Sequence, residues 1–218
     1  ELPEVETVVR RIAPRITGGR LVRARFLSAR VAKCPPRALE GRQVLAVRRH
    51  GKHILWDLND GNRLCIHLGM TGKLLLDGQP GPHTRAVFEF ECGPLLFDDM
   101  RMFGRIHLNR DLSALGPDAL TVGLDEFLAR LARRKTRIKP LLLDQKFICG
   151  VGNIYADESL FRARIHPQTP ASRLSRCHPA ERGGRRSPSS GSSTRCARSK
   201  VQAAPFPVAR WPGGSRTE

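Results

Sequence analysis

Short apolar segments separated by turn-forming residues fill the first 112 residues, and they constrain the fold more than any other feature. The triplet Asn59–Gly61 is one such turn signal, and Cys92-Gly93-Pro94 is another. Several short strands at this spacing are typical of a sandwich or a barrel. We therefore predict a β-rich domain over residues 1–112, opened by one helix from about Val5 to Ile12 that ends before Pro14. The predicted strands lie near residues 44–47, 54–58, 63–68, 86–90 and 95–97.

The pattern changes to helical spacing over residues 117–175. Leu124, Phe127, Leu128 and Leu131 recur on one helical face, and the basic run 133–135 suits the end of that helix. Two further helices are predicted, one near 138–143 and one that begins at Gly152-Asn153 and ends before His166-Pro167. Together with the strands, this compact helical module predicts the α+β class.

Residues 176–218 show neither periodicity. From residue 171 to the last residue there are nine Arg and one Lys against two Glu, among many Ser, Gly and Pro residues. Such a stretch buries too little apolar surface to offset the entropy lost on ordering. We expect a basic, disordered tail. The alternatives are a stretch read out of frame and a tail that binds DNA.

The charge balance narrows the class of partner. The chain has 38 Lys and Arg against 20 Asp and Glu, a net charge of +18. Such an excess favours a polyanion, because cationic side chains release the counterions of nucleic-acid phosphates. Charge alone separates neither DNA from RNA nor an enzyme from a ribosomal-type binder. With no signal peptide or long apolar span, we expect a cytoplasmic protein without a membrane partner, whose thiols are reduced.

Four short motifs carry polar or exposed groups that could do chemistry, and each is weak when taken separately. Glu1–Thr7 also suits an ordinary acidic first helical turn, and the basic run 48–53 suits either phosphate binding or a solvated hairpin. His67–Gly72 presents Met70 at a loop tip, where a core-filling role is the commoner one. The fourth motif, 98–104, places Arg and Phe beside a turn.

In this order, and followed by Gly150–Ala156, the motifs resemble those of the bacterial formamidopyrimidine-DNA glycosylase family. The resemblance covers residues 1–175, includes Leu115-Gly116-Pro117 and Lys139-Pro140, and favours this branch over endonuclease VIII-like relatives. It implies an N-terminal β-sandwich, a helix–two-turn–helix module and a C-terminal zinc finger. It also implies a monomer that binds double-stranded DNA with an oxidised base or an abasic site.

The same resemblance implies base-excision repair of oxidised purines such as 8-oxoguanine and formamidopyrimidines. The family's nucleophile is an N-terminal proline whose amine forms an imine with the sugar, followed by β,δ-elimination. Glu1 matches the adjacent general acid, and Lys52 matches the lysine that assists strand cleavage. A catalytically inactive remnant that binds damaged DNA is the alternative, and an RNA-binding protein is a third that explains the charge but not the motifs.

The resemblance further implies six DNA-binding residues. Met70, Arg101 and Phe103 would fill the space left by a flipped-out base, with Arg101 facing the orphaned partner base. Asn153, at a glycine-rich helix start, would hold a phosphate. His83 and Arg134 match further positions of DNA contact.

The sequence departs from the family pattern at three places. No proline precedes Glu1, and we expect that a Met-Pro dipeptide has been lost from the sequence. Cys177 and Cys196 stand alone instead of forming two C-x-x-C pairs, so no zinc ligands and no cofactor are predicted for this chain, and a frameshift near residue 176 would explain the loss. Met100 and Met102 stand where the family usually has Pro and Arg, and we expect a modest effect.

Overall fold

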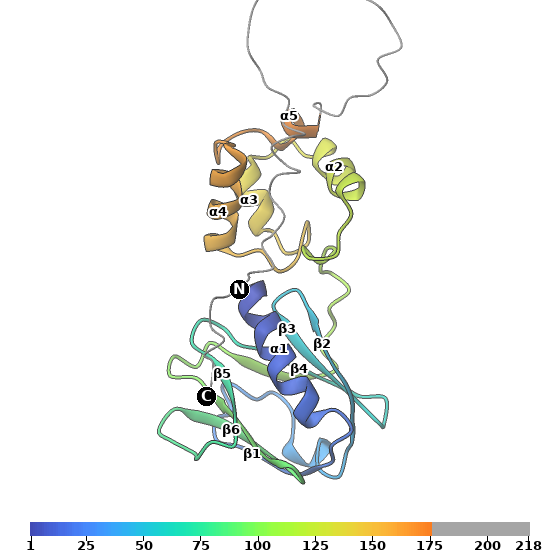
Figure 1. Cartoon of the computed structure of the whole chain (residues 1–218), viewed down its shortest axis with the longest axis vertical. Helices are drawn as coiled ribbons and strands as arrows, with labels where there is room; N and C mark the ends of the chain where they lie inside the picture. The colour runs from blue at the N-terminus through green and yellow to red at the C-terminus, as the bar shows by residue number, and fades with distance from the viewer. Residues whose placement is uncertain (176–218) are drawn as a thin grey trace, which may run out of the picture. The chain divides into compact units, whose positions relative to one another are not determined.

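The computed structural model describes residues 1–175, which form two compact units divided between Gly116 and Pro117 (Figure 1). In the described chain every strand lies in the first unit, while the second unit is built from helices. The predicted α+β class is therefore confirmed. No helix within these residues is long and apolar enough to cross a membrane. The predictions of a disordered tail and of missing zinc ligands fall on 176–218, outside the described residues.

The first unit is a sandwich of two antiparallel four-stranded sheets that enclose one apolar core. The first sheet has the order β1 (Leu21–Phe26), β6 (Thr84–Phe90), β7 (Gly93–Asp98), β5 (Lys73–Leu76). The second has the order β2 (Val44–His50), β3 (His53–Leu58), β4 (Arg63–His67), β8 (Arg105–Leu108). A short 3-10 helix, η1 (Pro36–Ala38), contacts β1. The sequence left a sandwich and a barrel open, and the structure has the sandwich.

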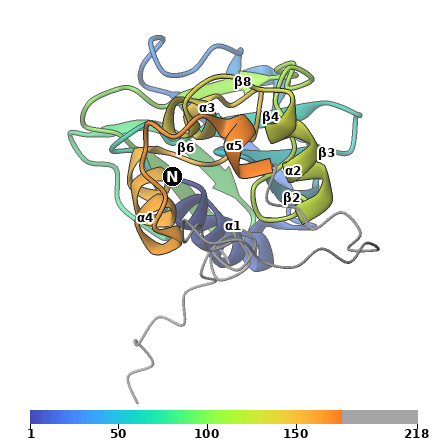
Figure 2. The same cartoon turned by 90° about the horizontal axis from the view of Figure 1, so that it is seen from above.

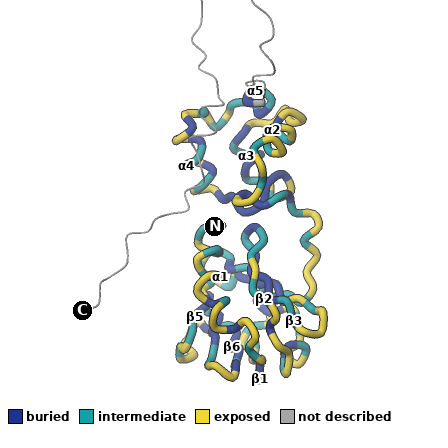
Figure 3. The backbone as a smooth tube through the Cα atoms, turned by 45° about the vertical axis from the view of Figure 1, so that its right-hand side comes forward, coloured by how far each residue is buried: buried dark blue, intermediate teal, exposed yellow. Residues whose placement is uncertain are grey.

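Aromatic packing joins the two sheets at the centre of this core. Trp56 of β3, which is almost fully buried, lies with its ring centroid 5.0 Å from that of Phe88 and 5.8 Å from that of Phe90, both on β6. These edge-to-face and tilted arrangements are the favourable ones for aromatic pairs. Figure 3 shows buried stretches along β3 and β6, with exposed residues gathered in the turns.

Helix α1 (Leu2–Ile16) is longer than predicted and continues through Pro14. Val5, Val9, Ile12 and Ile16 form its buried face, at a spacing of three and four residues. A proline inside a helix removes one hydrogen bond. The burial of Ile16 and the bond from the Thr17 amide to the Ala13 carbonyl, 3.0 Å, keep the last turn helical. The predicted end at Ile12 was therefore wrong.

The second unit contains α2 (Leu124–Ala132), α3 (Ile138–Leu143), α4 (Asn153–Ala163) and the unpredicted α5 (Ala171–Ser175). Helix α2 lies against α5, and α3 lies against α4 (Figure 2). The basic run that was predicted to end α2 does so, because Arg133, its first residue, is the C-cap of the helix. The predictions for α3 and for the start of α4 are confirmed.

Candidate functional site

Glu1 lies at the start of α1 and Lys52 lies in the turn between β2 and β3, and α1 contacts both of these strands. Glu1 is the N-cap of α1, and its amino group lies 3.0 Å from Glu4 Oε2. Burial lowers the pKa of the Lys52 ammonium, and the negative charges of Glu1 and Glu4 oppose this shift in part. A half-buried lysine whose pKa is lowered gives up its proton more readily than an exposed one, as a catalytic base must.

A part-buried ion pair fixes this turn, and sequence reasoning missed it. Arg49, whose side chain is 6% exposed, lies with Nε 2.8 Å from Glu6 Oε2 and donates from Nη1 to the Gly51 carbonyl at 2.9 Å. Burial alone would raise the pKa of the Glu6 carboxyl, but bonds and charges from Arg49 and Arg10 lower it overall. Arg49 therefore ties α1 to the turn that carries Lys52. The sequence had suggested phosphate binding or a solvated hairpin for the basic run 48–53, and neither interpretation included this internal contact.

Two histidines lie next to Lys52 on neighbouring strands. The rings of His53 and His67 are 5.0 Å apart between centroids. Burial is the main cause that lowers the pKa of His53 to about 3 and of His67 to about 4, and at His67 the positive charge of Arg110 adds to the effect, followed by those of Lys52 and the terminal amine. Both rings are therefore neutral near pH 7, and His67 Nδ1 accepts a hydrogen bond of 3.1 Å from the Gly69 amide.

This pair gives a first testable prediction, an acid-sensitive first unit. Because the folded pKa values lie below the ordinary 6.5, the unfolded chain binds more protons as the pH falls through 6.5. The free energy of unfolding should be highest above pH 6.5 and should decline from there toward pH 4, with a slope that approaches about 1.4 kcal/mol per pH unit for each histidine. Urea unfolding between pH 7 and pH 5 measures this slope above the range in which most carboxylates titrate.

The control for this prediction separates buried from exposed histidines. His53→Phe should flatten the slope, since it removes one of the two protonation sites and leaves a buried ring. His83→Gln replaces an exposed histidine of the same unit and serves as the control substitution. Equal slopes in wild type and His53→Phe would contradict the assignment.

Met70, Arg101 and Phe103 gather on two loops of the same unit. Met70 is 71% exposed and Phe103 is 41% exposed, unusual values for such large apolar side chains. The Arg101 guanidinium lies 4.8 Å from the centre of the Phe103 ring, a cation–π arrangement. The loops touch at Gly69, where an added Cβ would lie 2.7 Å from the Gly104 amide nitrogen. We call these three exposed side chains, Met70, Arg101 and Phe103, the wedge.

Two residues adjoin the wedge: Met102 lies between Arg101 and Phe103 in the sequence, and His83 is joined to the same loop by a backbone hydrogen bond. His83 is exposed, and its carbonyl accepts a hydrogen bond of 2.9 Å from the Asp99 amide. Met102 has the left-handed φ of +54° and packs against the core, with its sulfur 3.9 Å from the Ser28 hydroxyl. Asp99 itself is fully buried, and no sequence signal marked its side chain as more than part of a motif.

In the second unit, Asn153 is the first residue of α4 and is exposed. One side chain holds the loop before it: Gln145 accepts a bond from the Gly150 amide at 3.0 Å and donates to the Val151 carbonyl at 2.9 Å. This clamp leaves the amide end of α4 at a set position, and a helix start of this kind suits an anion. Sequence reasoning missed Gln145.

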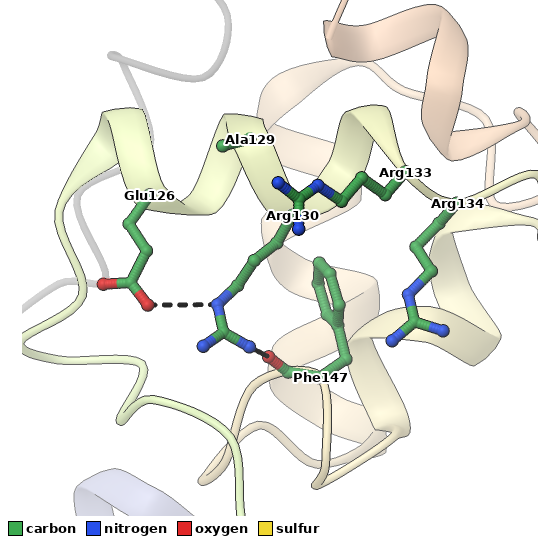
Figure 4. A pocket seen from close by; sticks show the side chains of 6 residues that line it. All are labelled: Glu126, Ala129, Arg130, Arg133, Arg134 and Phe147. Carbon is green, nitrogen blue, oxygen red and sulfur yellow. Dashed lines mark hydrogen bonds and ion pairs between the residues drawn. The ribbon is translucent and has the colours of Figure 1, made fainter.

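Arg134 lies just after α2 and lines a cavity of about 620 Å³ in the same unit (Figure 4). Arg130 and Arg133 also line it, and Arg130 pairs with Glu126 at 3.0 Å. The buried ring of Phe147 lies between Arg130 and Arg134 in the close view. Three arginines and one glutamate line the cavity, so its lining carries a net positive charge.

Comparison with known protein families gives two matches in chain order. The formamidopyrimidine-DNA glycosylase N-terminal domain matches residues 1–106, and the formamidopyrimidine-DNA glycosylase H2TH domain matches residues 114–180. A formamidopyrimidine-DNA glycosylase of Solibacter usitatus is 51% identical over 183 residues, which cover 80% of this chain and 69% of that protein.

Two crystal structures of the Lactococcus lactis formamidopyrimidine-DNA glycosylase share the fold. One, bound non-covalently to DNA with an abasic (AP) site, has a TM-score of 0.72 and 33% identity and covers 79% of this chain and 73% of that chain. The other, in complex with DNA that contains FAPY-dG, has a TM-score of 0.71 and 32% identity and covers 79% of this chain and 71% of that chain. On the sequence identity, the order of the two domains and the shared fold, the chain belongs to the formamidopyrimidine-DNA glycosylase family.

Proposed function

We propose that this chain is a base-excision repair glycosylase that removes oxidised purines from double-stranded DNA and then cuts the strand as an AP lyase. One observation carries the proposal: His67 packs against His53, the residue that follows Lys52, and it accepts a hydrogen bond of 3.1 Å from the amide of Gly69, the neighbour of Met70. The groups suited to chemistry and the exposed wedge are therefore next to each other in one unit, as excision of a flipped base requires.

DNA binding is the first step of the proposed reaction. The net charge of +18 attracts a duplex, and the Lactococcus relatives hold abasic or FAPY-dG DNA. Met70, Arg101 and Phe103 would enter the space left by the flipped base, where apolar wedges offset the lost stacking. His83, Arg134 and Asn153 would contact the DNA outside this space, each at an exposed position.

The proposed chemistry takes place at the N-terminal amine. The amine nitrogen forms a bond to the sugar C1′ while the glycosidic C–N bond breaks and the base leaves with a proton. Glu1 donates a proton to the ring oxygen as the sugar opens, and loss of the amine proton gives the imine. The imine acidifies C2′, so that a base can remove a proton there and expel the 3′ phosphate in β-elimination; δ-elimination then releases the 5′ phosphate. Lys52 would assist these proton transfers.

Release of the damaged base tests the proposal against the alternative of a damaged-DNA-binding remnant. A duplex with a single 8-oxoguanine or formamidopyrimidine is incubated with excess protein, and the free base is quantified by mass spectrometry. We expect base release together with strand cleavage. Tight, lesion-selective binding without release at any protein concentration would support the remnant and overturn the enzyme.

A second prediction concerns Arg101. Arg101→Ala removes the guanidinium that faces the orphaned base and stacks on Phe103, so affinity for lesion DNA should fall about tenfold or more. Affinity for intact duplex should change by much less, because intact DNA offers no vacated space. Fluorescence anisotropy with matched lesion and intact duplexes measures both. Arg63→Ala, an exposed arginine on β4 whose guanidinium pairs with Asp57 at 2.6 Å, is the control for lost charge. An equal loss on both duplexes would contradict the role.

A further inference from the structure

The buried residue Asp99 makes hydrogen bonds to every segment that carries a proposed DNA contact of the first unit. Its Oδ1 accepts from the Thr71 hydroxyl at 2.5 Å and from the Arg101 amide at 3.2 Å. Its Oδ2 accepts from the Gly104 amide at 2.7 Å. Its own amide donates to the His83 carbonyl at 2.9 Å. Asp99 itself is fully buried, and its bond from the Gly104 amide is buried with it, whereas the bonds from Thr71 and Arg101 are part-buried.

The four residues that make these bonds to Asp99 either belong to the wedge, adjoin a wedge residue in the sequence, or are His83. Arg101 and His83 bond to Asp99 directly through their backbones. Met70 immediately precedes Thr71, and Phe103 immediately precedes Gly104. The carbonyl of Asp99 also accepts a hydrogen bond of 2.9 Å from Nε of Arg85, which lies two residues after His83.

We propose that Asp99 is a positioning residue that holds Met70, His83, Arg101 and Phe103 in one fixed arrangement before DNA binds. The inference rests on the proposed function, since it assigns the cause of lesion discrimination at that same site. Ordering a loop upon binding reduces affinity, and a loop that is already held avoids this loss. Asp99 would therefore act on recognition of the lesion through the wedge, without touching DNA.

The chemistry of Asp99→Asn makes the test sharp. An amide has only one acceptor oxygen, and it replaces the other oxygen by a donor. If the side-chain NH2 of the new asparagine points toward Gly104, it faces the Gly104 amide, which is also a donor. If the NH2 points toward Thr71, the Thr71 hydroxyl can turn to accept from it, but the Arg101 amide then faces a donor. In the first orientation the Gly104 amide loses its partner, and in the second the Arg101 amide keeps only its bond of 3.3 Å to the Thr71 hydroxyl oxygen. Thr71→Val is the milder variant, because it removes a single hydroxyl and keeps the shape.

The experiment measures the ratio of affinities for intact and lesion duplexes, together with the melting temperature by circular dichroism. Asp99→Asn should lower lesion discrimination by about tenfold at a temperature where the protein is folded, the effect of one lost charge-assisted bond, and Thr71→Val should lower it by less. Asp57→Asn is the matched control: it is a hydrogen-bonded aspartate on β3, away from both loops, and should leave the ratio unchanged. If Asp99→Asn does not fold, Thr71→Val against Asp57→Asn carries the comparison.

A double-variant comparison separates positioning from mere stability. If Asp99 acts through Arg101, adding Asp99→Asn to Arg101→Ala should reduce discrimination by less than it does alone. A lower melting temperature with unchanged discrimination in Asp99→Asn and Thr71→Val would overturn the positioning role while leaving the proposed function in place. If Arg101→Ala and Met70→Ala also fail to change discrimination, the proposed function of the wedge falls, and this inference falls with it.

Discussion

A chain that carries one proline ahead of Glu1 is expected to yield about a hundredfold more covalent adduct with abasic-site DNA under borohydride than a chain that begins at Glu1. Borohydride reduces an imine to a stable amine, so the adduct counts productive attack on C1′. One added residue moves the terminal amine by up to about 3.5 Å. In the family pattern this places the amine one residue before the general acid, whereas the amine of Glu1 pairs with Glu4.

Two controls decide what causes the gain. Alanine ahead of Glu1 puts a primary amine at the same position, and it should recover part of the adduct if position matters more than the secondary amine. Acetylation of the terminus should abolish the adduct in each chain, whereas an adduct that survives would place the imine on a lysine such as Lys52. Equal yields with and without the proline would contradict the proposed nucleophile.

Gly69→Ala is expected to lower the free energy of unfolding by about 4 kcal/mol, the largest loss among the variants considered. Gly69 has a φ of +66°, a conformation that costs other residues energy. An added Cβ would also lie 2.7 Å from both the Gly104 nitrogen and the Phe103 carbonyl carbon, and backbone atoms cannot turn aside as side chains do. Urea unfolding measures the loss, and lesion discrimination should fall with it because the two loops must separate.

Gly61→Ala is the matched control for this variant. Gly61 has a φ of +81°, but an added Cβ would meet nothing within 4 Å. It should therefore lose only the backbone term, about 1–2 kcal/mol. Similar losses at both positions would mean that the contact between the loops contributes nothing, and it would weaken the case for a preformed wedge.

The spacing of apolar segments was enough to predict β2, β3, β4, β6 and β7 of the first unit, since a half-buried strand and a turn residue each leave a local signal, but β1, β5 and β8 were not predicted. The path of α1 past Pro14 had no such signal, because the burial of Ile16 depends on strands far along the chain. Tertiary packing decided this helix end against local propensity. The start of α4 was predictable because Gly152 and Asn153 mark it locally.

In the candidate site, too, some residues could be predicted from the sequence and others could not. The order of the motifs pointed to Met70, Arg101 and Phe103, and the structure brings their loops together. The residues that hold the site were not predictable, because Glu6 and Arg49, a part-buried pair, are separated by 43 positions and have the sequence pattern of two surface charges. Asp99 likewise stands in a polar motif, and only the fold turns its carboxylate inward.

Each unit contains a different fluorescent residue that can report on its folding. The chain has two Trp and one Tyr: Trp56 lies in the core of the first unit, and Tyr155 lies on α4 of the second. The other tryptophan, Trp211, can be replaced by Phe, after which selective excitation of Trp56 reports the sandwich alone. Tyrosine emission then follows the helical unit, so the order in which the two units unfold, or respond to DNA, can be read from one unlabelled sample.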